Sequence, residues 1–220
     1  MYESRDQAGP PDSARARYNA FVARRTADWY DQALSRAGML PLGRRDILDL
    51  GCGGGWFLMG CRDHWGAQGA RHAGVDLVPG RIEALRQQCP ALELHACSAD
   101  ALPLDDGGFD LIHQSMMFSS IPDEGIRQRI ASEIRRVLRP GGRLLWYDYI
   151  WNPVNRAMQG LPLRKVLRLF PGWRKVVRLH IHPMPPLARL LVRLRCGGLI
   201  PWIERLGVLN AFELLVLEKP

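Results

Sequence analysis

The sequence lacks the features of a membrane-spanning, secreted or metal-binding protein. It has no apolar run of about eighteen residues, and no charged and apolar leader opens it, so we expect neither a transmembrane span nor a signal peptide. Its five cysteines contain no C-x-x-C pair and are odd in number, which favours neither a disulfide framework nor a zinc site. We therefore expect a cytoplasmic protein without a bound metal.

Acidic residues are scarce in one region. The net charge of the 220 residues is +8, but residues 151–205 hold eleven Arg and Lys and a single acid, Glu204, so this segment carries +10 and the rest −2. A content of 47% hydrophobic and 24% charged residues is typical of a packed globular protein. The length suits one α/β domain, and the local basicity points to an anionic partner or a solvated face.

A glycine-rich stretch is the clearest local motif. Ile47 to Leu50 reads as a buried strand, and an apolar helix is expected from Trp56. The glycines between them, Gly51, Gly53 and Gly55, allow positive φ and close approach of a ligand to the helix N-terminus, as in a nucleotide-binding loop. Trp56 stands where a dinucleotide-binding fold has its third glycine, which disfavours a nicotinamide-dependent reductase without excluding it.

Strand and helix patterns alternate along most of the chain. Strands are predicted at 47–50, 70–76, 92–96, 109–114, 143–149, 173–182 and 211–217, a turn at 139–142, and helices at 12–38, 55–65, 79–88, 123–138, 155–170, 185–194 and 199–206. Such alternation predicts a parallel sheet with ligands at the carboxyl ends of its strands. The glycine loop, Asp76, Asp100 and the residues after Ile112 follow strands and should converge there. The last two strands could pair at a sheet edge.

Four blocks in order carry a resemblance to a known family. ILDLGCGGGWF, GVDLVPGRIEALR, CSADALPLDDGGFDLIHQSMMFSSIPD and VLRPGGRLLWYDY, over about residues 45–150, resemble the class I S-adenosylmethionine-dependent methyltransferases, in particular the type 11 small-molecule branch. The resemblance implies a Rossmann-like doubly wound α/β fold with a mostly parallel seven-stranded sheet, an antiparallel last strand and an N-terminal lid helix. It also implies S-adenosyl-L-methionine as cofactor and S-adenosyl-L-homocysteine as product.

The resemblance also implies a domain plan and a set of cofactor contacts. Residues 1–11 are polar and contain Gly9-Pro10-Pro11, so we expect a flexible tail there. Residues 12–220 would be one methyltransferase domain with a helical lid (12–40), a cofactor-binding core (45–150) and basic acceptor-side helices with the last two strands (151–220). Asp76 would accept hydrogen bonds from both ribose hydroxyls, and Asp100 would bind the adenine amino group, although a solvated strand-end acid is the alternative for each. The remaining contacts would come from Asp49, Gly51, Cys52 (as a loop filler without chemistry), Gly53, Gly55, Leu77, Ala101, His113 and Gln114.

The general base is open at this level. Members of the family often carry a histidine at the position of Ser119 or Ser120, and this chain does not. A near-neutral imidazole suits proton removal, so the catalytic candidates are His180, His182 and His113, with structural roles as the alternative. His180 and His182 would share one face if their stretch is extended. The weaker candidates and possible lid contacts are Tyr18, Trp29, Tyr30 and Tyr147, each of which could equally be a packing residue.

The acceptor is predicted only by class. A sugar or natural-product hydroxyl ranks first and an amine or carbon later. Residues 156–205 mix basic and apolar side chains and read as amphipathic helices, which suits a solvated face, an anionic or phosphate-linked acceptor, or an anionic membrane surface. Nucleic acid is not expected, because stacking aromatics and known modules are missing. A cofactor-binding protein without turnover remains an alternative.

Overall fold

A seven-stranded sheet forms the centre of the structure. The computed structural model describes residues 14–68, 71–151, 158–207 and 209–220, with side chains from residue 19 onward. The strand order is β3-β2-β1-β4-β5-β7-β6, in which the first five strands are parallel and β7 is antiparallel to both of its neighbours. The strands are β1 (Ile47–Leu50), β2 (His72–Asp76), β3 (Glu93–Ala96), β4 (Phe109–Ser115), β5 (Leu138–Tyr149), β6 (Arg174–Pro183) and β7 (Asn210–Glu218).

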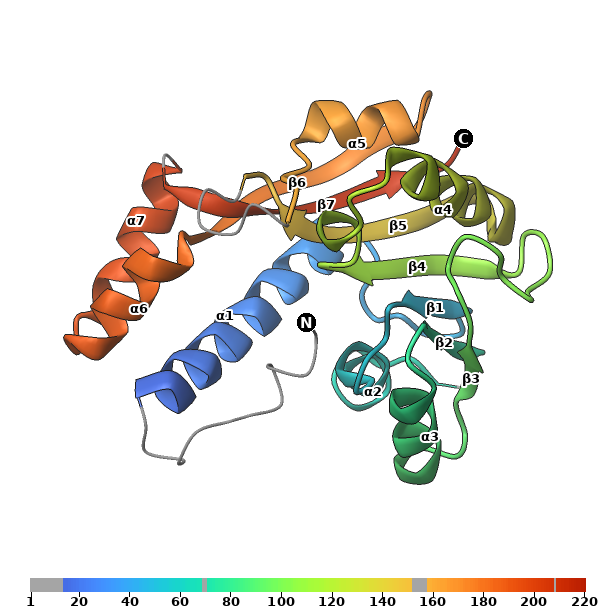
Figure 1. Ribbon diagram of the computed structural model, residues 1–220, viewed down its shortest axis with the longest axis horizontal. Coiled ribbons are helices and arrows are strands. Elements are labelled where there is room, and N and C mark those ends of the chain that lie inside the picture. The colour runs from blue at the N-terminus through green and yellow to red at the C-terminus, as the bar shows by residue number, and fades with distance from the viewer. Residues whose placement is uncertain (1–13, 69–70, 152–157, 208) are drawn as a thin grey trace.

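Helices cover both faces of this sheet (Figure 1). One apolar cluster joins Ile47 and Leu145 to α1, α2 and α3, and a second joins Leu48 and Leu144 to α4 and α5, because alternate residues of each strand face opposite sides. α6 and α7 stand beside α1 at the far end of β6 and β7 (Figure 1). The helices are α1 (Ala14–Arg36), α2 (Trp56–Asp63), α3 (Pro79–Gln88), α4 (Glu124–Val137), α5 (Leu163–Leu169), α6 (Pro185–Arg193) and α7 (Ile200–Leu206), with 3-10 turns η2 (Phe118–Ser120) and η3 (Gly197–Leu199).

The predicted architecture is confirmed. The sheet is doubly wound and mostly parallel, and its last strand in sequence runs antiparallel, inserted between β5 and β6. The two C-terminal strands do pair, as expected. The predicted tail at residues 1–11 and the start of the first helix at residues 12–13 lie outside the described residues, as does Ala70 at the start of the second predicted strand.

Two sequence expectations were wrong in their boundaries. The helix predicted over 155–170 is only α5, which begins after Pro162, while residues 158–162 are not helical and 155–157 are not described. Proline is favoured at the start of a helix and disfavoured in the interior of one. The helix therefore begins after Pro162, although the apolar pattern in the sequence starts earlier. The basic amphipathic surface of this segment is therefore shorter than predicted.

The turn predicted at residues 139–142 lies inside strand β5. Leu138 pairs with Phe109 and Arg143 pairs with Leu111, so the intervening residues bulge opposite Asp110. Gly141 takes φ +73°, and the bulge stays in the sheet because Gly141 N donates to the carbonyl of Lys219 and Gly142 accepts from its N–H. The glycines thus serve a β-bulge and not a strand boundary.

No helix among the described residues is both long and apolar enough to cross a bilayer. The five cysteines are unpaired: Cys52, Cys61 and Cys89 are buried, Cys97 is half-buried, and Cys196 is exposed. Within the same described part of the chain, no group of three or more His, Cys, Asp or Glu side chains could hold a metal ion.

Candidate active site

The glycine loop lies at the carboxyl end of β1, between that strand and α2. Gly51, Gly53 and Gly55 all have positive φ, between 54° and 74°. The three positions differ in what a side chain would meet: at Gly55 a Cβ would lie 2.6 Å from Leu85 Cδ1, whereas at Gly53 it would find no atom within 4 Å. Gly55 is therefore explained by packing on α3, and Gly53 leaves a bare stretch of backbone open to a ligand.

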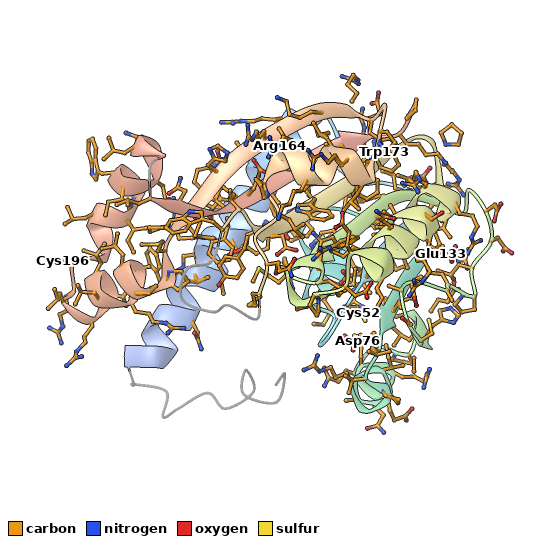
Figure 2. All side chains as sticks on the ribbon, turned by 45° about the horizontal axis from the view of Figure 1, so that its top comes forward. Cys52, Asp76, Glu133, Arg164, Trp173 and Cys196 are labelled. Carbon is orange, nitrogen blue, oxygen red and sulfur yellow. The ribbon has the colours of Figure 1, made fainter. Side chains whose placement is uncertain are left out.

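Asp76 ends β2 directly beside this loop (Figure 2). Its side chain accepts hydrogen bonds from Gly53 N (3.0 Å, Oδ2) and from Val78 N (2.9 Å, Oδ1), and the residue is 6% exposed. Each oxygen keeps a lone pair for a further donor. The next residue, Leu77, has an apolar side chain that is 71% exposed. Such a side chain contributes little to stability while it faces water. A buried carboxylate and a bare apolar side chain thus stand together at the strand end.

Asp100 lies in the loop after β3 and is held from α4. Its Oδ2 accepts a hydrogen bond from Arg129 Nε at 3.1 Å. Hydrogen bonds from Ser98 and Arg129 keep the pKa of Asp100 below its ordinary value, so the carboxylate is charged at neutral pH. Arg129 was not among the residues singled out in the sequence, since its partner lies on another element.

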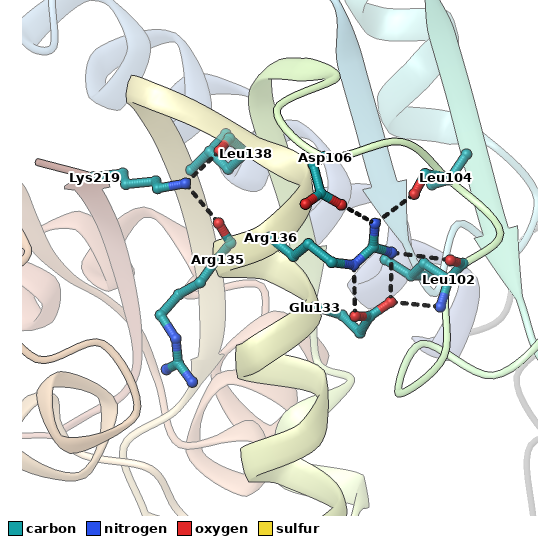
Figure 3. A network of polar contacts seen from close by, with 8 residues as sticks. All are labelled: Leu102, Leu104, Asp106, Glu133, Arg135, Arg136, Leu138 and Lys219. Carbon is teal, nitrogen blue, oxygen red and sulfur yellow. Dashed lines mark hydrogen bonds and ion pairs between the residues drawn. The ribbon is translucent and has the colours of Figure 1, made fainter.

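An arginine network fixes the rest of that loop (Figure 3). Arg136 of α4 donates to the carbonyls of Leu102 (3.0 Å) and Leu104 (2.6 Å) and forms ion pairs with Asp106 and Glu133. Leu102 N also donates to Glu133. In a separate group, Lys219 Nζ donates to the carbonyls of Arg135 and Leu138 at the end of α4. The segment that carries Asp100 and Ala101 is therefore anchored at several points to the end of α4.

Asp49, His113 and Tyr30 form a buried chain under the glycine loop. His113 Nδ1 lies 2.6 Å from Asp49 Oδ1, and its Nε2 lies 2.8 Å from the Tyr30 hydroxyl. The His113 ring also stacks on Phe57, with ring centroids 3.8 Å apart. Burial, followed by the charges of Tyr147 and Asp49, raises the pKa of Tyr30, so this hydroxyl stays protonated. Both ring nitrogens of His113 are engaged, which leaves the imidazole without direct access to an acceptor.

Gln114 and Asp148 organise the segment after β4. Gln114 Nε2 donates to the carbonyl of Tyr147 (3.4 Å), and its Oε1 accepts from Met117 N (3.3 Å). Asp148 accepts from Ser119 N (3.1 Å) and Tyr149 N (2.8 Å) and is fully buried. Burial raises the pKa of Asp148 to about 6, against the opposing hydrogen bonds from Ser119 and Tyr149.

The raised pKa of Asp148 predicts a pH-dependent stability. Between about pH 4 and pH 6 the native carboxyl keeps a proton that the unfolded one has lost, so this group costs stability as the pH rises through that window. A pKa raised from 3.8 to about 6 corresponds to about 3 kcal/mol. Relative to Asp148→Asn, the wild-type free energy of unfolding should fall by up to about that amount from pH 4 to pH 7. Urea unfolding of both proteins measures it, and a constant difference over this range would contradict the assignment.

The two late histidines do not share a face. His180 is exposed enough to reach solvent, and its Nε2 lies 3.2 Å from Glu213 Oε1, beside Arg178. His182 has φ +51°, so β6 is not extended there, and its side chain turns to the buried side, 4% exposed. The condition for a shared face, an extended stretch, is therefore not met, because the left-handed residue reverses the alternation of side chains.

His182 lies in a polar group at the edge of a small cavity. Its Nδ1 lies 3.4 Å from Glu204 Oε1, and its Nε2 lies 3.0 Å from Thr26 Oγ1 of α1. Arg25 forms an ion pair with the same Glu204. Although burial opposes it, hydrogen bonds from His182 and Arg25 hold the pKa of Glu204 below its ordinary value. The single hydroxyl proton of Thr26 is donated to the carbonyl of Val22 (2.7 Å), so Thr26 Oγ1 accepts from the Nε2–H of His182, while Nδ1 faces the Glu204 carboxylate.

A row of aromatic rings joins this cavity to the glycine loop. Trp56 contacts Tyr30 (5.3 Å between ring centroids), Tyr30 contacts Tyr147 (6.1 Å), and Tyr147 contacts His182 (6.3 Å). Tyr30 is completely buried, so it anchors α1 to the sheet and is not free to meet a substrate. Trp29 is half-buried under Arg25, and the Tyr18 side chain is not among the described ones.

Comparison with known proteins gives this arrangement a family. Residues 47–142 match the family described as "Methyltransferase domain". This stretch of the chain is a methyltransferase domain. An uncharacterized methyltransferase of Mycobacteroides abscessus is 30% identical over 180 residues, which are 78% of this chain and 65% of the relative. A malonyl-[acyl-carrier protein] O-methyltransferase of Hahella chejuensis is 35% identical over 115 residues, 51% of this chain and 38% of the relative.

The fold of the methyltransferase domain extends through the C-terminal strands. The solved structure of geranyl diphosphate methyltransferase in complex with SAM superposes with a TM-score of 0.67 at 16% identity, covering 98% of this chain and 93% of that one. At this identity the likeness concerns the fold alone. The chain spans less than two thirds of the length of either curated relative, so acceptor and partners are not transferred from them.

The methyltransferase domain has residues that fit S-adenosylmethionine. A methyltransferase domain needs a methyl donor, and the solved structure of geranyl diphosphate methyltransferase contains SAM. The space beyond Gly53 would take the methionine part, the free lone pairs of Asp76 suit two ribose hydroxyls, and exposed Leu77 suits an adenine face. The Asp49 carboxylate is already bonded to His113, so any part it has in binding the amino group is shared with that histidine.

Several site residues had no signal in the sequence. Glu204 and Thr26 are common residue types at positions without a motif, and Asp148 lies in the block VLRPGGRLLWYDY without having been assigned a role. Their roles come from contacts with segments far away in the chain, such as Glu204 with Arg25 and Thr26 with His182. Asp148 alone carried a usable sign, because it follows apolar Leu144 to Tyr147 in a predicted buried strand, where a lone acid needs a partner.

Proposed function

We propose that the protein transfers a methyl group from S-adenosylmethionine to an oxygen atom of a small-molecule or glycan-like acceptor. The observation that carries the proposal is the junction of Gly53 and Asp76 within the methyltransferase domain: open backbone beside a buried carboxylate that has acceptor capacity to spare. A nicotinamide cofactor fits less well, because the bulky ring of Trp56 replaces the third glycine of that motif.

The protein's own part in such a reaction is positioning and proton removal. Bound S-adenosylmethionine supplies an activated methyl group on a sulfonium sulfur. Asp76, Leu77 and the loop of Asp100 would hold the nucleoside, while the bare backbone at Gly53 would fix the amino-acid end. An acceptor hydroxyl would have to lose its proton as it takes up the methyl group, so the chain must hold the hydroxyl in line with that group and offer a base beside it.

Among the candidate histidines we assign the base to His182. His113 has both nitrogens occupied in the core, and His180 lies on the solvent side against Glu213. The Nδ1 of His182 faces the Glu204 carboxylate, and its Nε2 is held only by Thr26 of α1, so the outward movement of α1 proposed below would free this nitrogen. The ring lies at a cavity lined by Phe21, Val22, Tyr147, Pro183, Ala188, Ile200 and Phe212. The carboxylate sets the ring tautomer and stabilises the imidazolium formed on proton uptake.

This cavity also supports a lid role for α1. Its volume is about 20 Å³, enough for roughly one water and far too small for a sugar-sized acceptor. Phe21, Val22 and Thr26 of α1 form one wall of the site. We infer that α1 swings outward to admit the acceptor and returns to exclude water, as catalytic lids do.

Oxygen is the preferred acceptor atom for two reasons. A hydroxyl acceptor needs a base beside it to take its proton. Carbon and amine acceptors need other kinds of activation. The similar protein of Hahella chejuensis is named as an O-methyltransferase, which supports the same atom class. The anionic acceptor was expected from the basic residues 156–205, and α5 does not support it, because Arg164 and Arg168 are exposed on the sheet face opposite α1 and do not approach His182.

Labelled methyl transfer tests the function. The purified protein is incubated with S-adenosylmethionine carrying a labelled methyl group and with an extract of the source organism, and labelled small molecules are separated and identified. We expect one product with an O-methyl group and formation of S-adenosylhomocysteine. Binding of S-adenosylhomocysteine without any labelled product would point to a cofactor-binding protein without turnover, and a thermal shift with NADH alone would reject the cofactor.

A further inference from the structure

The α6–α7 pair presents an unusual surface, which we call the tip and define as residues 186–207. It stands beyond the end of the sheet next to α1, and Cys196 marks it in Figure 2. Eleven large apolar residues are exposed in the described part of the chain, and five of them lie in the tip: Leu190, Leu194, Leu199, Trp202 and Leu206. Trp202 and Leu206 are 65% and 73% exposed, so the apolar residues are concentrated here and not scattered.

Basic residues are interleaved with these apolar side chains. Arg189, Leu190, Arg193 and Leu194 share the exposed stripe of α6, at the spacing of one helix face. Arg205 of α7 lies over the ring of Trp202, with Cζ 5.4 Å from the centroid. The tip has a single acid, Glu204, which is buried and paired with Arg25 and His182. Among its own residues the tip therefore combines basic and apolar side chains on its exposed surface, and its single acid is buried.

We propose that the tip docks on the surface of an anionic lipid bilayer. Leucine and tryptophan side chains gain by entering the acyl boundary, while arginines on the same surface pair with lipid phosphates. The exposed stripes of two short helices suit binding in the interface plane, and neither helix is long enough to span the bilayer. A second copy of the chain is a poorer occupant, because a two-fold contact would bring the arginines of both tips together without an acid between them.

Docking would orient the catalytic centre. Glu204 belongs to the same helix as Trp202 and holds His182 from its buried side, so α7 joins the docking surface to the acceptor cavity. An acceptor dissolved in or anchored to the lipid would then reach the protein on the side where α1 and α6 meet. The docking itself does not depend on the methyl transfer proposed above.

Sedimentation with vesicles tests the docking directly. The complete protein is mixed at low salt with vesicles of phosphatidylcholine alone or of phosphatidylcholine with phosphatidylglycerol. We expect cosedimentation with the anionic vesicles only, weakened by added salt. The double variant Trp202→Ser/Leu206→Ser should lower the partition coefficient about tenfold or more, because it removes the two most exposed apolar side chains of the tip.

A matched control separates the tip from overall charge. Arg164→Gln/Arg168→Gln removes two exposed charges from α5, on the other face of the sheet, and Arg193→Gln/Arg195→Gln removes two from the tip. We expect the tip pair to weaken vesicle binding much more than the α5 pair. Equal loss from both pairs would mean non-specific attraction and would overturn the proposal, and so would absence of binding to anionic vesicles at low salt.

A probe on Cys196 gives a second readout. In a Cys97→Ser background, Cys196 is the exposed thiol to label, since the other three cysteines are buried. An environment-sensitive fluorophore there should shift to shorter wavelength on adding anionic vesicles. Melting curves of the variants should match the wild type, because the substituted side chains are exposed. If the probe shifts instead with protein concentration or on adding an acidic carrier protein, and vesicles leave it unchanged, the occupant is protein and the lipid assignment is wrong.

Discussion

Replacing Asp76 with alanine is expected to weaken binding of S-adenosylhomocysteine about a hundredfold or more. Hydrogen bonds to a charged group contribute about 1.5–3 kcal/mol each, and two ribose hydroxyls would lose theirs together. Asp76 is suited to this task because Gly53 N and Val78 N hold both oxygens in place at the end of β2. Isothermal titration calorimetry measures the affinity, and unchanged binding would remove Asp76 from the cofactor site.

The control for this variant must separate binding from folding. Asp76→Ala also frees two backbone N–H groups near the surface, so a melting temperature lower by a few degrees is expected without ligand. Asp63→Ala removes the same charge from α2, where the side chain is exposed and paired with neighbouring Arg62. It should bind S-adenosylhomocysteine as the wild type does. A loss in both variants would indicate a general charge effect.

Replacing His182 with asparagine is expected to lower kcat by about two to three orders of magnitude, the usual effect of losing a general base. Asparagine is chosen because His182 has φ +51°, a conformation that asparagine tolerates and most other residues do not. The loss should appear in kcat with little change in the affinity for S-adenosylhomocysteine. The rate is measured as labelled methyl transfer to the acceptor found with the wild-type protein.

His180→Asn is the matched control for this second variant. It removes the same chemical group two residues away, where the imidazole faces solvent and Glu213. We expect near wild-type kcat. A kcat lowered less than about threefold in His182→Asn would show that proton removal occurs elsewhere, and the opposite ranking of the two variants would move the base to His180.

The segment from Ile47 to Trp56 was predictable because local chemistry decides it. An apolar strand, glycines at positive φ and a helix start leave few other conformations, and the structure has β1, the loop and α2 where the pattern put them. Asp123 as the N-cap of α4 is a similar case, since its side chain accepts from Ile126 N. These features depend on neighbours in sequence.

The acceptor side was less predictable because it depends on distant contacts. The reversal of His182 follows from its pairing with Glu204 of α7 and Thr26 of α1, which no strand periodicity encodes. Likewise, the basic region carries less unbalanced positive charge than its sequence suggests. Arg174 forms an ion pair with Glu218 of β7, and Arg178 forms one with Glu213 of the same strand. Only the fold reveals which arginines keep an unbalanced charge.

The position of β7 between β5 and β6 sets the order in which the protein can be completed during translation. Until synthesis has passed Glu218, β5 and β6 each present an unpaired edge, and the nine residues that join them have not been made. The nascent chain can close the cofactor half of the sheet early, whereas the strand that supports His182 must wait. The half-finished chain is therefore the form most exposed to aggregation, and chaperone dependence should be greatest at that stage.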